Sequence, residues 1–245
     1  MTDRLPIFES KAAARGWAWD RLQAEKLARF PFPPHGRIPN FVGADLAAKR
    51  LFDAPEWRGA RAIKVNPDSP QKPVRQLALS LGIRVYVPTP RLAGGFHLLD
   101  PEHIDPQNFE AAAMLATMAE HSEPVSLADL PQLDAIVTGC AAVTLAGKRC
   151  GKGEGYSDLE YAILRELGHA PVPVATTVHD AQLVGDFPVE ANDLPLSLIC
   201  TPTRTIRVAD PLPAPTGIDW SRLDEEDLTR MSLLKDLRAM KTFAG

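Results

Sequence analysis

The sequence predicts an α/β protein with an open, mostly parallel sheet flanked by helices. Residues 61–88 read as a strand, a helix and a strand: "RAIKVN", then "PVRQLALSLG" stopped by Gly82, then "IRVYVP". This order forms a βαβ unit, whose strands pair in parallel through a right-handed crossover. Further strand and helix patterns alternate downstream. A chain of 245 residues with 45% hydrophobic residues has room for one large α/β domain or two small ones.

The elements before this unit are mainly helical. Residues 9–29, "ESKAAARGWAWDRLQAEKLAR", are rich in Ala, Leu and Lys/Arg and predict a helix broken or bent near Gly16. The segment "FPFPPHGRIPN" carries four prolines and cannot be helical. A second helix is expected over "GADLAAKRLF", directly before the βαβ unit.

The elements after the unit continue the alternation. "FEAAAMLATMAEH" predicts a helix, "DAIVTG" a strand, and "AAVTLAG" runs into a glycine-rich segment. "SDLEYAILRELG" predicts a helix that Gly168 ends, and "VPVATTVH" and "LSLICT" predict strands, with "TIRVA" as a further candidate.

The tail differs in character from the rest of the chain. "DPLPAPTGIDW" reads as a proline-rich linker, and "DEEDLTRMSLLKDLRAMK" as a final amphipathic helix. We therefore expect an α/β domain over residues 1–210, followed by a linker and helix over 211–245. The helix can pack on the core or on a partner subunit, which would make a homodimer.

Composition excludes several classes of partner. The net charge of −4 gives no global basic field for a nucleic acid or an anionic membrane, and neither partner is expected. No apolar run approaches the ~18 residues that span a bilayer. The beginning "MTDRLPIFESKAAARG" is charged where a signal peptide would be apolar, which predicts a cytoplasmic protein.

Cysteine and histidine spacing also argues against several kinds of site. Cys140, Cys150 and Cys200 are isolated thiols without CxxC spacing, so neither a zinc knuckle nor a disulfide framework is expected. Cys150 lies in the glycine-rich segment, where we interpret it as a small residue tolerated in a tight loop. The six histidines show no HExxH or HxH pattern, which argues against a histidine-held metal.

Polar residues follow several of the predicted strands, at the edge of the sheet where ligands gather in open α/β folds. The residues are Asn66, Asp68, Thr89, Arg91, His179, Asp180, Thr203 and Arg204. Each alone is most simply a polar loop residue, and only their shared position suggests a site.

The segment "RCGKGEGYSDLEYA", residues 149–162, is the strongest signal in the chain. Three alternate glycines permit positive φ and remove every Cβ from one side of the loop, which lets backbone N–H groups curl around an anion. Ser157 and Glu160 form a capping-box pattern that predicts a helix start at Ser157. A glycine loop that meets a helix N-terminus can hold phosphate, and Arg149 and Lys152 add positive charge.

The segment is neither a Walker A loop, since no GK[ST] ends it, nor a GxGxxG dinucleotide fingerprint. A simple hairpin turn remains the alternative. Asp158 has two interpretations as well. The helix dipole alone favours an acid in a first turn, and beside bound triphosphate the same carboxylate would be a natural Mg²⁺ ligand.

This segment resembles the R-x-G-x-G-x-G-[YF]-Y-D motif of the 5-formyltetrahydrofolate cyclo-ligases, and it is closer still to the methenyltetrahydrofolate synthetase domain-containing branch of that family. The resemblance also takes in "HGRIPNFVGADLAAKRL", "IKVNPDSPQKPVRQLALSLGIRVYVPTPRL", "VHDAQLV" and "LICTPTRTI". It covers roughly residues 10–208 and leaves the tail outside.

The resemblance implies an open α/β fold related to the ribose-phosphate isomerase and CoA-transferase group. It also implies an enzyme of folate one-carbon metabolism that uses ATP and Mg²⁺ to convert 5-formyltetrahydrofolate to 5,10-methenyltetrahydrofolate, with release of ADP and phosphate. In that reaction the formyl oxygen attacks the γ-phosphate, N10 closes the ring and phosphate leaves. Such chemistry needs charge neutralisation and positioning more than a protein nucleophile.

Site residues carry over from the family motifs. The family's K-x-x-x-R phosphate contacts match Lys11 and Arg15, which are four apart and therefore share one helical face. The remaining matches are Arg149, Gly151, Lys152, Gly153, Gly155 and Tyr156 for the nucleotide loop, Asp158 and Asp193 for Mg²⁺, and Asp68 with Tyr156 for the folate. Lys11, Arg15 and Arg149 would also act in catalysis.

The chain departs from the family beside the magnesium aspartate. The cyclo-ligases usually have a second aromatic residue and an arginine there, whereas this chain has Ser157 and Leu159. Two alternatives therefore stay open. One is a diverged member that binds ATP or another phosphorylated ligand without cyclo-ligase activity. The other is an RNA-associated module, which the absence of an RNP-like aromatic motif and of a basic excess places last.

Overall fold

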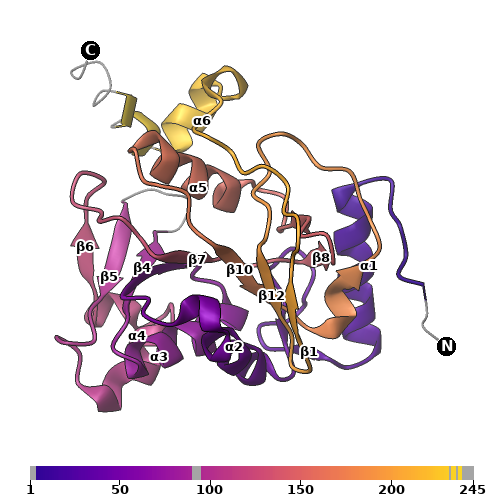
Figure 1. The fold of residues 1–245 in the computed structure, drawn as a ribbon, viewed down its shortest axis with the longest axis horizontal. Helices are drawn as coiled ribbons and strands as arrows, with labels where there is room; N and C mark the ends of the chain where they lie inside the picture. The colour runs from indigo at the N-terminus through magenta and orange to yellow at the C-terminus, as the bar shows by residue number, and fades with distance from the viewer. Residues whose placement is uncertain (1–3, 90–94, 232, 236, 239–245) are drawn as a thin grey trace.

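The computed structural model describes residues 4–89, 95–231, 233–235 and 237–238. Within them an eight-stranded sheet has the strand order β13-β12-β10-β7-β3-β4-β5-β6 (Figure 1). The five central strands are parallel: β12 (Leu198–Cys200), β10 (Val174–Thr177), β7 (Ala135–Val137), β3 (Ala62–Val65) and β4 (Arg84–Pro88). The edge strands β13 (Thr205–Arg207), β5 (Phe96–Leu99) and β6 (Glu123–Val125) are antiparallel. The predicted α/β class and mostly parallel sheet are confirmed.

The predicted βαβ unit consists of β3, α3 (Lys72–Ser80) and β4. Ile63 pairs with Val85 in parallel register, and α3 buries Val74 and Leu79 against this part of the sheet. Gly82 follows the helix at φ +74°, a conformation that glycine adopts without strain, so it ends the helix as expected.

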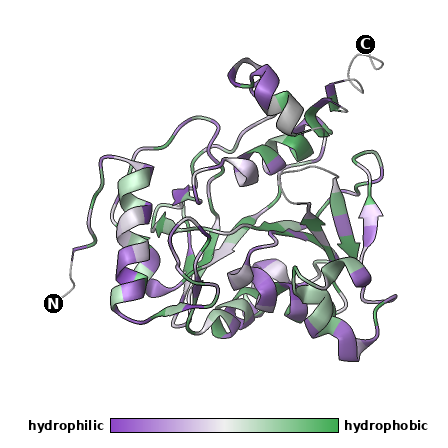
Figure 2. Ribbon diagram, turned by 180° about the vertical axis from the view of Figure 1, so that it is seen from behind, coloured by the Kyte–Doolittle hydropathy of each residue, from purple (hydrophilic) through white to green (hydrophobic). Residues whose placement is uncertain are grey.

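Helices cover both faces of the sheet, as the strongly apolar central strands in Figure 2 require. α2 (Ala44–Asp53), α3 and α4 (Phe109–Ala113) lie on one face, where Leu51 and Leu79 pack against Val65. α5 (Tyr156–Glu166) lies on the other face, where Ile163 packs in one cluster with Ile136. The carboxyl ends of the parallel strands are left accessible for a site.

The first helix is shorter than the predicted 9–29 segment, and it is not broken at Gly16. α1 (Lys11–Ala24) runs without a break through Gly16, and the Ser10 side chain caps it by accepting a hydrogen bond from the Ala13 N–H at 3.1 Å. A glycine inside a helix costs about 1 kcal/mol relative to alanine. Full burial of Ala14, Ala18 and Leu22 along one face offsets that cost.

The proline-rich segment after α1 is non-helical, as predicted. It lies between two short strands, β1 (Ala28–Arg29) and β2 (Asn40–Phe41), which pair antiparallel.

The helix expected over residues 109–121 is shorter than predicted. α4 ends at Ala113, Met114 turns to an extended conformation, and a single 3-10 turn follows at Met118–Glu120. Thr117 donates its hydroxyl proton to the Ala111 carbonyl at 2.6 Å, so a side chain takes the place of a helical backbone donor.

A small second sheet positions the glycine-rich segment. It contains β8 (Ala142–Thr144), β9 (Arg149–Cys150) and β11 (Leu183–Val184), with β8 and β9 joined as a hairpin. At the hairpin turn, Gly147 has φ +81° and its backbone lies so close to the Leu196 carbonyl that a Cβ would be 2.5 Å from the oxygen. β9 leads directly into residues 151–155, which connect to α5.

The tail packs on the core of the same chain. α6 (Glu225–Arg230) lies over α5 in Figure 1, and Leu228, Met231 and Leu234 belong to the same buried cluster as Leu164 of α5. Part of the predicted final helix, at 232, 236 and 239–241, lies outside the described residues. The homodimer and the domain boundary at residue 210 stay predictions.

Candidate functional site

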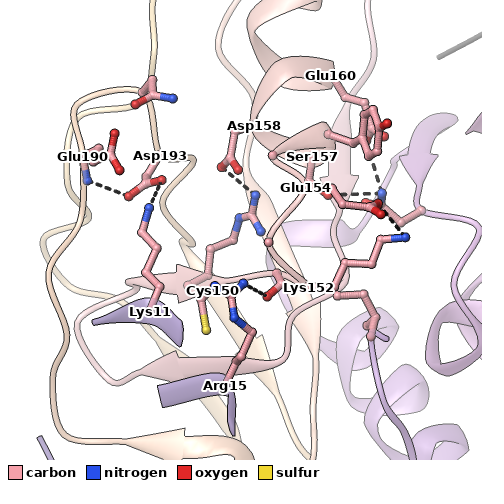
Figure 3. Close-up of a pocket in the computed structure, with 18 of the residues that line it drawn as sticks. Lys11, Arg15, Cys150, Lys152, Glu154, Ser157, Asp158, Glu160, Glu190 and Asp193 are labelled. Carbon is pink, nitrogen blue, oxygen red and sulfur yellow. Dashed lines mark hydrogen bonds and ion pairs between the residues drawn. The ribbon is translucent and has the colours of Figure 1, made fainter. Parts of the chain in front are cut away.

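A pocket of about 910 Å³ lies where the carboxyl end of β3 meets the glycine-rich segment and the start of α1 (Figure 3). The lining contains every site residue predicted from the sequence: Lys11, Arg15, Asp68, Arg149, Gly151, Lys152, Gly153, Gly155, Tyr156, Asp158 and Asp193. These residues come from four separate parts of the chain. The structure thus brings the candidate residues together around one pocket.

The glycine loop, residues 151–155, has the backbone that its sequence predicts. Gly153 and Gly155 have φ of +111° and +73°, values that residues with a side chain rarely adopt. A Cβ on Gly153 would also lie 2.8 Å from Nη1 of Arg15, which donates a hydrogen bond to the Gly151 carbonyl at 3.1 Å. The loop therefore needs glycine at residue 153 for two reasons.

The predicted capping box at Ser157 is wrong. α5 begins at Tyr156, and its N-cap is Gly155 in the left-handed conformation without a side-chain cap. The Ser157 and Glu160 side chains instead accept hydrogen bonds from Asn66, at 3.3 and 3.2 Å. Both side chains therefore contact Asn66 at the end of β3. A capping pattern describes only neighbouring residues, so it does not predict this tertiary contact.

Lys11 and Arg15 share one face of α1, as their spacing predicts, but they contact different loops. Lys11 Nζ donates to Asp193 Oδ1 at 2.5 Å, whereas Arg15 reaches the glycine loop (Figure 3). Asp193 also accepts a hydrogen bond from the Glu190 N–H at 2.6 Å. α1 thus ties the loop before β12 and the glycine loop to the same side of the pocket.

Arg149 and Asp158 form an ion pair inside the pocket wall, with 2.6 Å between Nη2 and Oδ1. Asp158 Oδ1 also accepts a hydrogen bond from the Leu194 N–H at 2.8 Å. Burial alone would lower the pKa of Arg149, but the Asp158 carboxylate raises it overall, so the guanidinium is always charged. Its Nε is buried and has no hydrogen-bond partner within the described residues.

The two aspartates fit a magnesium ion that is shared with a phosphate group. Asp158 and Asp193 belong to adjoining segments, because Leu194 donates its N–H to Asp158. In the part of the chain that the structure describes, no three His, Cys, Asp or Glu side chains gather closely enough to hold a metal by themselves. Mg²⁺ usually takes only one or two carboxylates and completes its shell with phosphate oxygens and waters.

Lysine 152 contributes a fourth cation to the lining. Its Nζ lies 2.7 Å from the Glu154 carboxylate, and the side chain is 38% exposed, so the pair is open to water and exchangeable. Of the four, Lys11, Arg149 and Lys152 each pair with a carboxylate of the lining, and Arg15 donates to the Gly151 carbonyl.

The pocket wall beneath Ser157 contains a buried charge pair that the sequence analysis missed. Lys64 of β3 is 1% exposed, forms an ion pair with Glu160 of α5, and donates to Asn66 Oδ1 at 3.0 Å. The signal available in the sequence was a lysine in the middle of an apolar parallel strand, "RAIKVN". Charged side chains are almost never fully buried unless they are paired.

A second buried cation, Arg75 of α3, holds the segment that carries Asp68. Its Nη1 donates to the carbonyls of Asn66 and Asp68, at 2.5 and 3.2 Å, and its Nε to the Ala113 carbonyl at 2.9 Å. Burial lowers the pKa of Arg75 to about 10, and burial raises the pKa of Asp68. Asp68 lines the pocket, as predicted, with a carboxyl group that is easier to protonate than an exposed one.

The other strand-end residues do not form one site. Asn66, Asp68 and Thr89 line the pocket, and Arg91 lies outside the described residues. His179, Asp180, Thr203 and Arg204 lie elsewhere, where Asp180 accepts hydrogen bonds from Thr203 Oγ1 at 2.9 Å and Arg204 Nε at 3.0 Å. That satisfied ion pair connects β12 and its following turn to the end of β10.

The tail also reaches the pocket, which the sequence analysis did not predict. Arg222 lines the rim, forms an ion pair with Glu190, and donates to Asn192 Oδ1 at 2.7 Å. The segment after residue 211 therefore supports the loop that carries Asp193.

Cys150 lines the pocket but is a poor nucleophile. Burial raises its pKa to about 11, so its thiol is protonated at neutral pH. Cys150 lies in β9 and packs in a buried cluster with Ala14 and Ala18, so it is a core residue of a strand and not the tight-loop residue that the sequence suggests. Among the described residues, no helix is both long and apolar enough to cross a bilayer.

The fold and the position of the pocket define an α/β protein with a ligand site at the carboxyl edge of a parallel sheet. The 5-formyltetrahydrofolate cyclo-ligase family matches residues 9–202. The methenyltetrahydrofolate synthase domain-containing protein of Mus musculus is 42% identical over 243 residues, which cover 96% of this chain and 65% of the mouse protein. The 5-formyltetrahydrofolate cyclo-ligase of Escherichia coli strain K12 is 30% identical over 167 residues, which cover 64% of this chain and 87% of that protein.

The chain belongs to the 5-formyltetrahydrofolate cyclo-ligase family, which confirms the resemblance seen in the sequence. The NMR structure of Aquifex aeolicus 5,10-methenyltetrahydrofolate synthetase matches 82% of this chain and 93% of its own, with a TM-score of 0.51 and 18% identity, and supports the fold alone. The chain spans 65% of the length of the mouse relative and 63% of that from Homo sapiens.

Proposed function

We propose that the chain converts 5-formyltetrahydrofolate to 5,10-methenyltetrahydrofolate with MgATP, and releases ADP and phosphate. One observation carries the proposal: residues from α1, the Asn66–Asp68 segment, the glycine loop and the Asp193 loop converge on one pocket. The lining has five cations, four of them around a loop with glycine at alternate positions, an arrangement suited to a triphosphate with its magnesium. The family match supplies the substrate class.

The roles of the residues follow from their placement. Gly151, Gly153 and Gly155 let the loop backbone approach the phosphates, and Lys11, Arg15 and Lys152 neutralise their charge. Arg149 lines the pocket and stays charged, so it adds to the positive charge near the phosphates. Asp158 and Asp193 would hold Mg²⁺, which supplies further charge neutralisation when bound. Asp68 and Tyr156 also line the pocket and would contact the folate.

The reaction needs these positions more than it needs a nucleophile from the protein. The formyl oxygen forms a bond to the γ-phosphorus while the bond to ADP breaks. N10 then attacks the formyl carbon and releases its proton to solvent, the carbon–oxygen bond breaks, and the formyl oxygen leaves as part of phosphate. Effective concentration and charge stabilisation are what such a transfer requires from a site.

The test is an assay of purified protein with MgATP and 5-formyltetrahydrofolate, in which methenyl product is followed by absorbance and ADP in parallel. Equal formation of both products, with loss of both in Arg149→Met, supports the proposal. Failure of the native protein to form methenyl product under saturating ligands contradicts it.

The second candidate is a diverged member that binds ATP or another phosphorylated ligand without this activity. It is favoured by Ser157 and Leu159, which stand where the cyclo-ligases usually have an aromatic residue and an arginine. MgATP affinity with no measurable affinity for 5-formyltetrahydrofolate in calorimetry would select this candidate.

A further inference from the structure

Four polar side chains from two elements meet at one wall of the pocket. Lys64 on β3 donates to Asn66 Oδ1 at 3.0 Å, and Asn66 Nδ2 donates to Ser157 Oγ at 3.3 Å. Asn66 Nδ2 also donates to Glu160 Oε2 at 3.2 Å, and Glu160 pairs with Lys64. Asn66, Ser157 and Glu160 line the pocket, whereas Lys64 lies behind them.

The amide of Asn66 can have only one orientation in this network. An ammonium group only donates, so the atom that faces Lys64 must be the amide oxygen. A carboxylate only accepts, so the atom that faces Glu160 must be the amide nitrogen. The two contacts demand the same orientation, and the nitrogen therefore also faces Ser157.

This orientation determines what the Ser157 hydroxyl can do. Because Asn66 donates to it, Ser157 Oγ acts as an acceptor on that side, and its single proton must point elsewhere. Within the described residues, Ser157 Oγ takes part in no second hydrogen bond. Ser157 sits in the first turn of α5, directly after the glycine loop, and lines the pocket (Figure 3).

We propose that Ser157 donates a hydrogen bond to an oxygen atom of the bound substrates, and that Lys64 and Asn66 are positioning residues that aim this proton. The acceptor is a phosphoryl oxygen of the nucleotide or the formyl oxygen of the folate. The inference rests on the proposed function. It assigns a function to Ser157, which stands where the cyclo-ligases usually have an aromatic residue.

The buried ion pair is consistent with this role. Removing a lysine and a glutamate from water is costly, and pairs of this kind are weak devices for stability alone. Here Lys64 contacts the amide oxygen of Asn66 and Glu160 contacts its amide nitrogen. The free-energy cost of burying the two charges is therefore accompanied by a fixed orientation of the Asn66 side chain in the pocket wall.

The first part of the test removes the hydroxyl. Ser157→Ala should lower the affinity for MgATP or for 5-formyltetrahydrofolate, or kcat, by about tenfold, the effect of one lost hydrogen bond. Measuring the two affinities separately identifies which oxygen accepts. Ser157→Thr retains a hydroxyl and should stay within about twofold. The matched control is Ser80→Ala, whose hydroxyl is exposed on α3 and donates to the Gln76 carbonyl.

The second part tests the positioning residues with a double-mutant cycle. In Asn66→Asp the new carboxylate accepts from Ser157 and turns its proton away from the pocket, so the loss should match that of Ser157→Ala. In a Ser157→Ala background the same change should add no more than about twofold. Charge repulsion or faulty folding would act equally in both backgrounds, and thermal unfolding of each variant checks the fold.

The outcomes separate this inference from the proposed function. If the native protein turns over and Ser157→Ala keeps both affinities and kcat, the donor role is overturned. Equal losses from Asn66→Asp in both backgrounds overturn the positioning role. If the native protein binds MgATP without turnover, the proposed function fails, and the MgATP affinities of the variants still decide the inference. If it binds neither ligand, both fail.

Discussion

Arg149 donates a hydrogen bond to Asp158 across 2.6 Å inside the pocket wall, so the carboxylate expected to hold magnesium is already paired with a buried cation. The pair joins β9 to the first turn of α5, and the Leu194 N–H connects it to the loop that carries Asp193. Asp158 therefore has a structural and a chemical role at once, and a substitution there should affect both stability and activity.

Asp158→Asn should lower turnover by about 100-fold, because a neutral amide binds Mg²⁺ poorly. It should also lower the free energy of unfolding by about 1–3 kcal/mol, because the buried Arg149 guanidinium would lose its carboxylate partner. Turnover over a range of Mg²⁺ concentrations and urea unfolding measure the two effects.

The matched control is Asp180→Asn, which weakens an ion pair with Arg204 outside the pocket. It should leave turnover unchanged. If Asp158→Asn affected unfolding alone, Asp158 would serve only α5 and its pair with Arg149.

Gly153→Val should weaken MgATP binding by about tenfold or more. The loop has φ +111° at this residue, and a Cβ would lie 2.8 Å from the Arg15 guanidinium, so both the backbone and Arg15 must shift. Calorimetric titration with MgATP measures the loss. Gly59→Val is the control, since Gly59 also has positive φ, at +85°, but no atom lies within 4 Å of its Cβ position. Unchanged MgATP affinity in Gly153→Val would contradict the phosphate-cradle interpretation.

Leu234→Ala should lower the free energy of unfolding by about 2–4 kcal/mol, because Leu234 is fully buried in the core cluster that contains α5. Leu212→Ala, at a side chain that is 40% exposed, should change it by less than about 0.5 kcal/mol. Urea unfolding of both variants tests whether the tail belongs to the folded core. Equal, small effects would mean that the tail contributes little to it.

Stability should fall above about pH 8.5. Burial raises the pKa of Cys150 to about 11 and that of Cys200 to about 12, whereas an unfolded chain ionises its thiols near 8.5. Between these values the folded state holds protons that the unfolded state has lost. Each thiol therefore removes about 1 kcal/mol of stability by pH 9.5. The difference in unfolding free energy between pH 7.5 and 9.5 should shrink in Cys200→Ala, and an unaltered difference would refute the assignment.

The parts of the fold that the sequence predicts are those with a local signal. The βαβ unit over residues 61–88 shows apolar strands, a periodic helix and a glycine stop, and all three lie where expected. β5, β6 and β11 were not predicted, because they are short and lie outside the parallel centre of the main sheet. Their pairing depends on neighbours distant in the chain, which a single segment does not encode.

The same distinction between local signals and contacts with distant residues applies to the candidate site. The glycine loop and the four-residue spacing of Lys11 and Arg15 can be recognised within short segments of the sequence. Residues 151–155, Lys11 and Arg15 all line the pocket. Lys64 and Glu160 are 96 positions apart, so nothing in either segment shows that the two charges neutralise each other. The spacing of Ser157 and Glu160 fits a capping box. In the structure, however, both side chains accept hydrogen bonds from the Asn66 amide instead.

The most direct measurement follows the formyl oxygen. The protein is given MgATP and 5-formyltetrahydrofolate labelled with ¹⁸O in the formyl group, and the released phosphate is analysed by mass spectrometry together with the methenyl product. If the formyl oxygen attacks the γ-phosphate in this pocket, one ¹⁸O enters phosphate for each methenyl product formed. Unlabelled phosphate, or phosphate without methenyl product, would contradict the account.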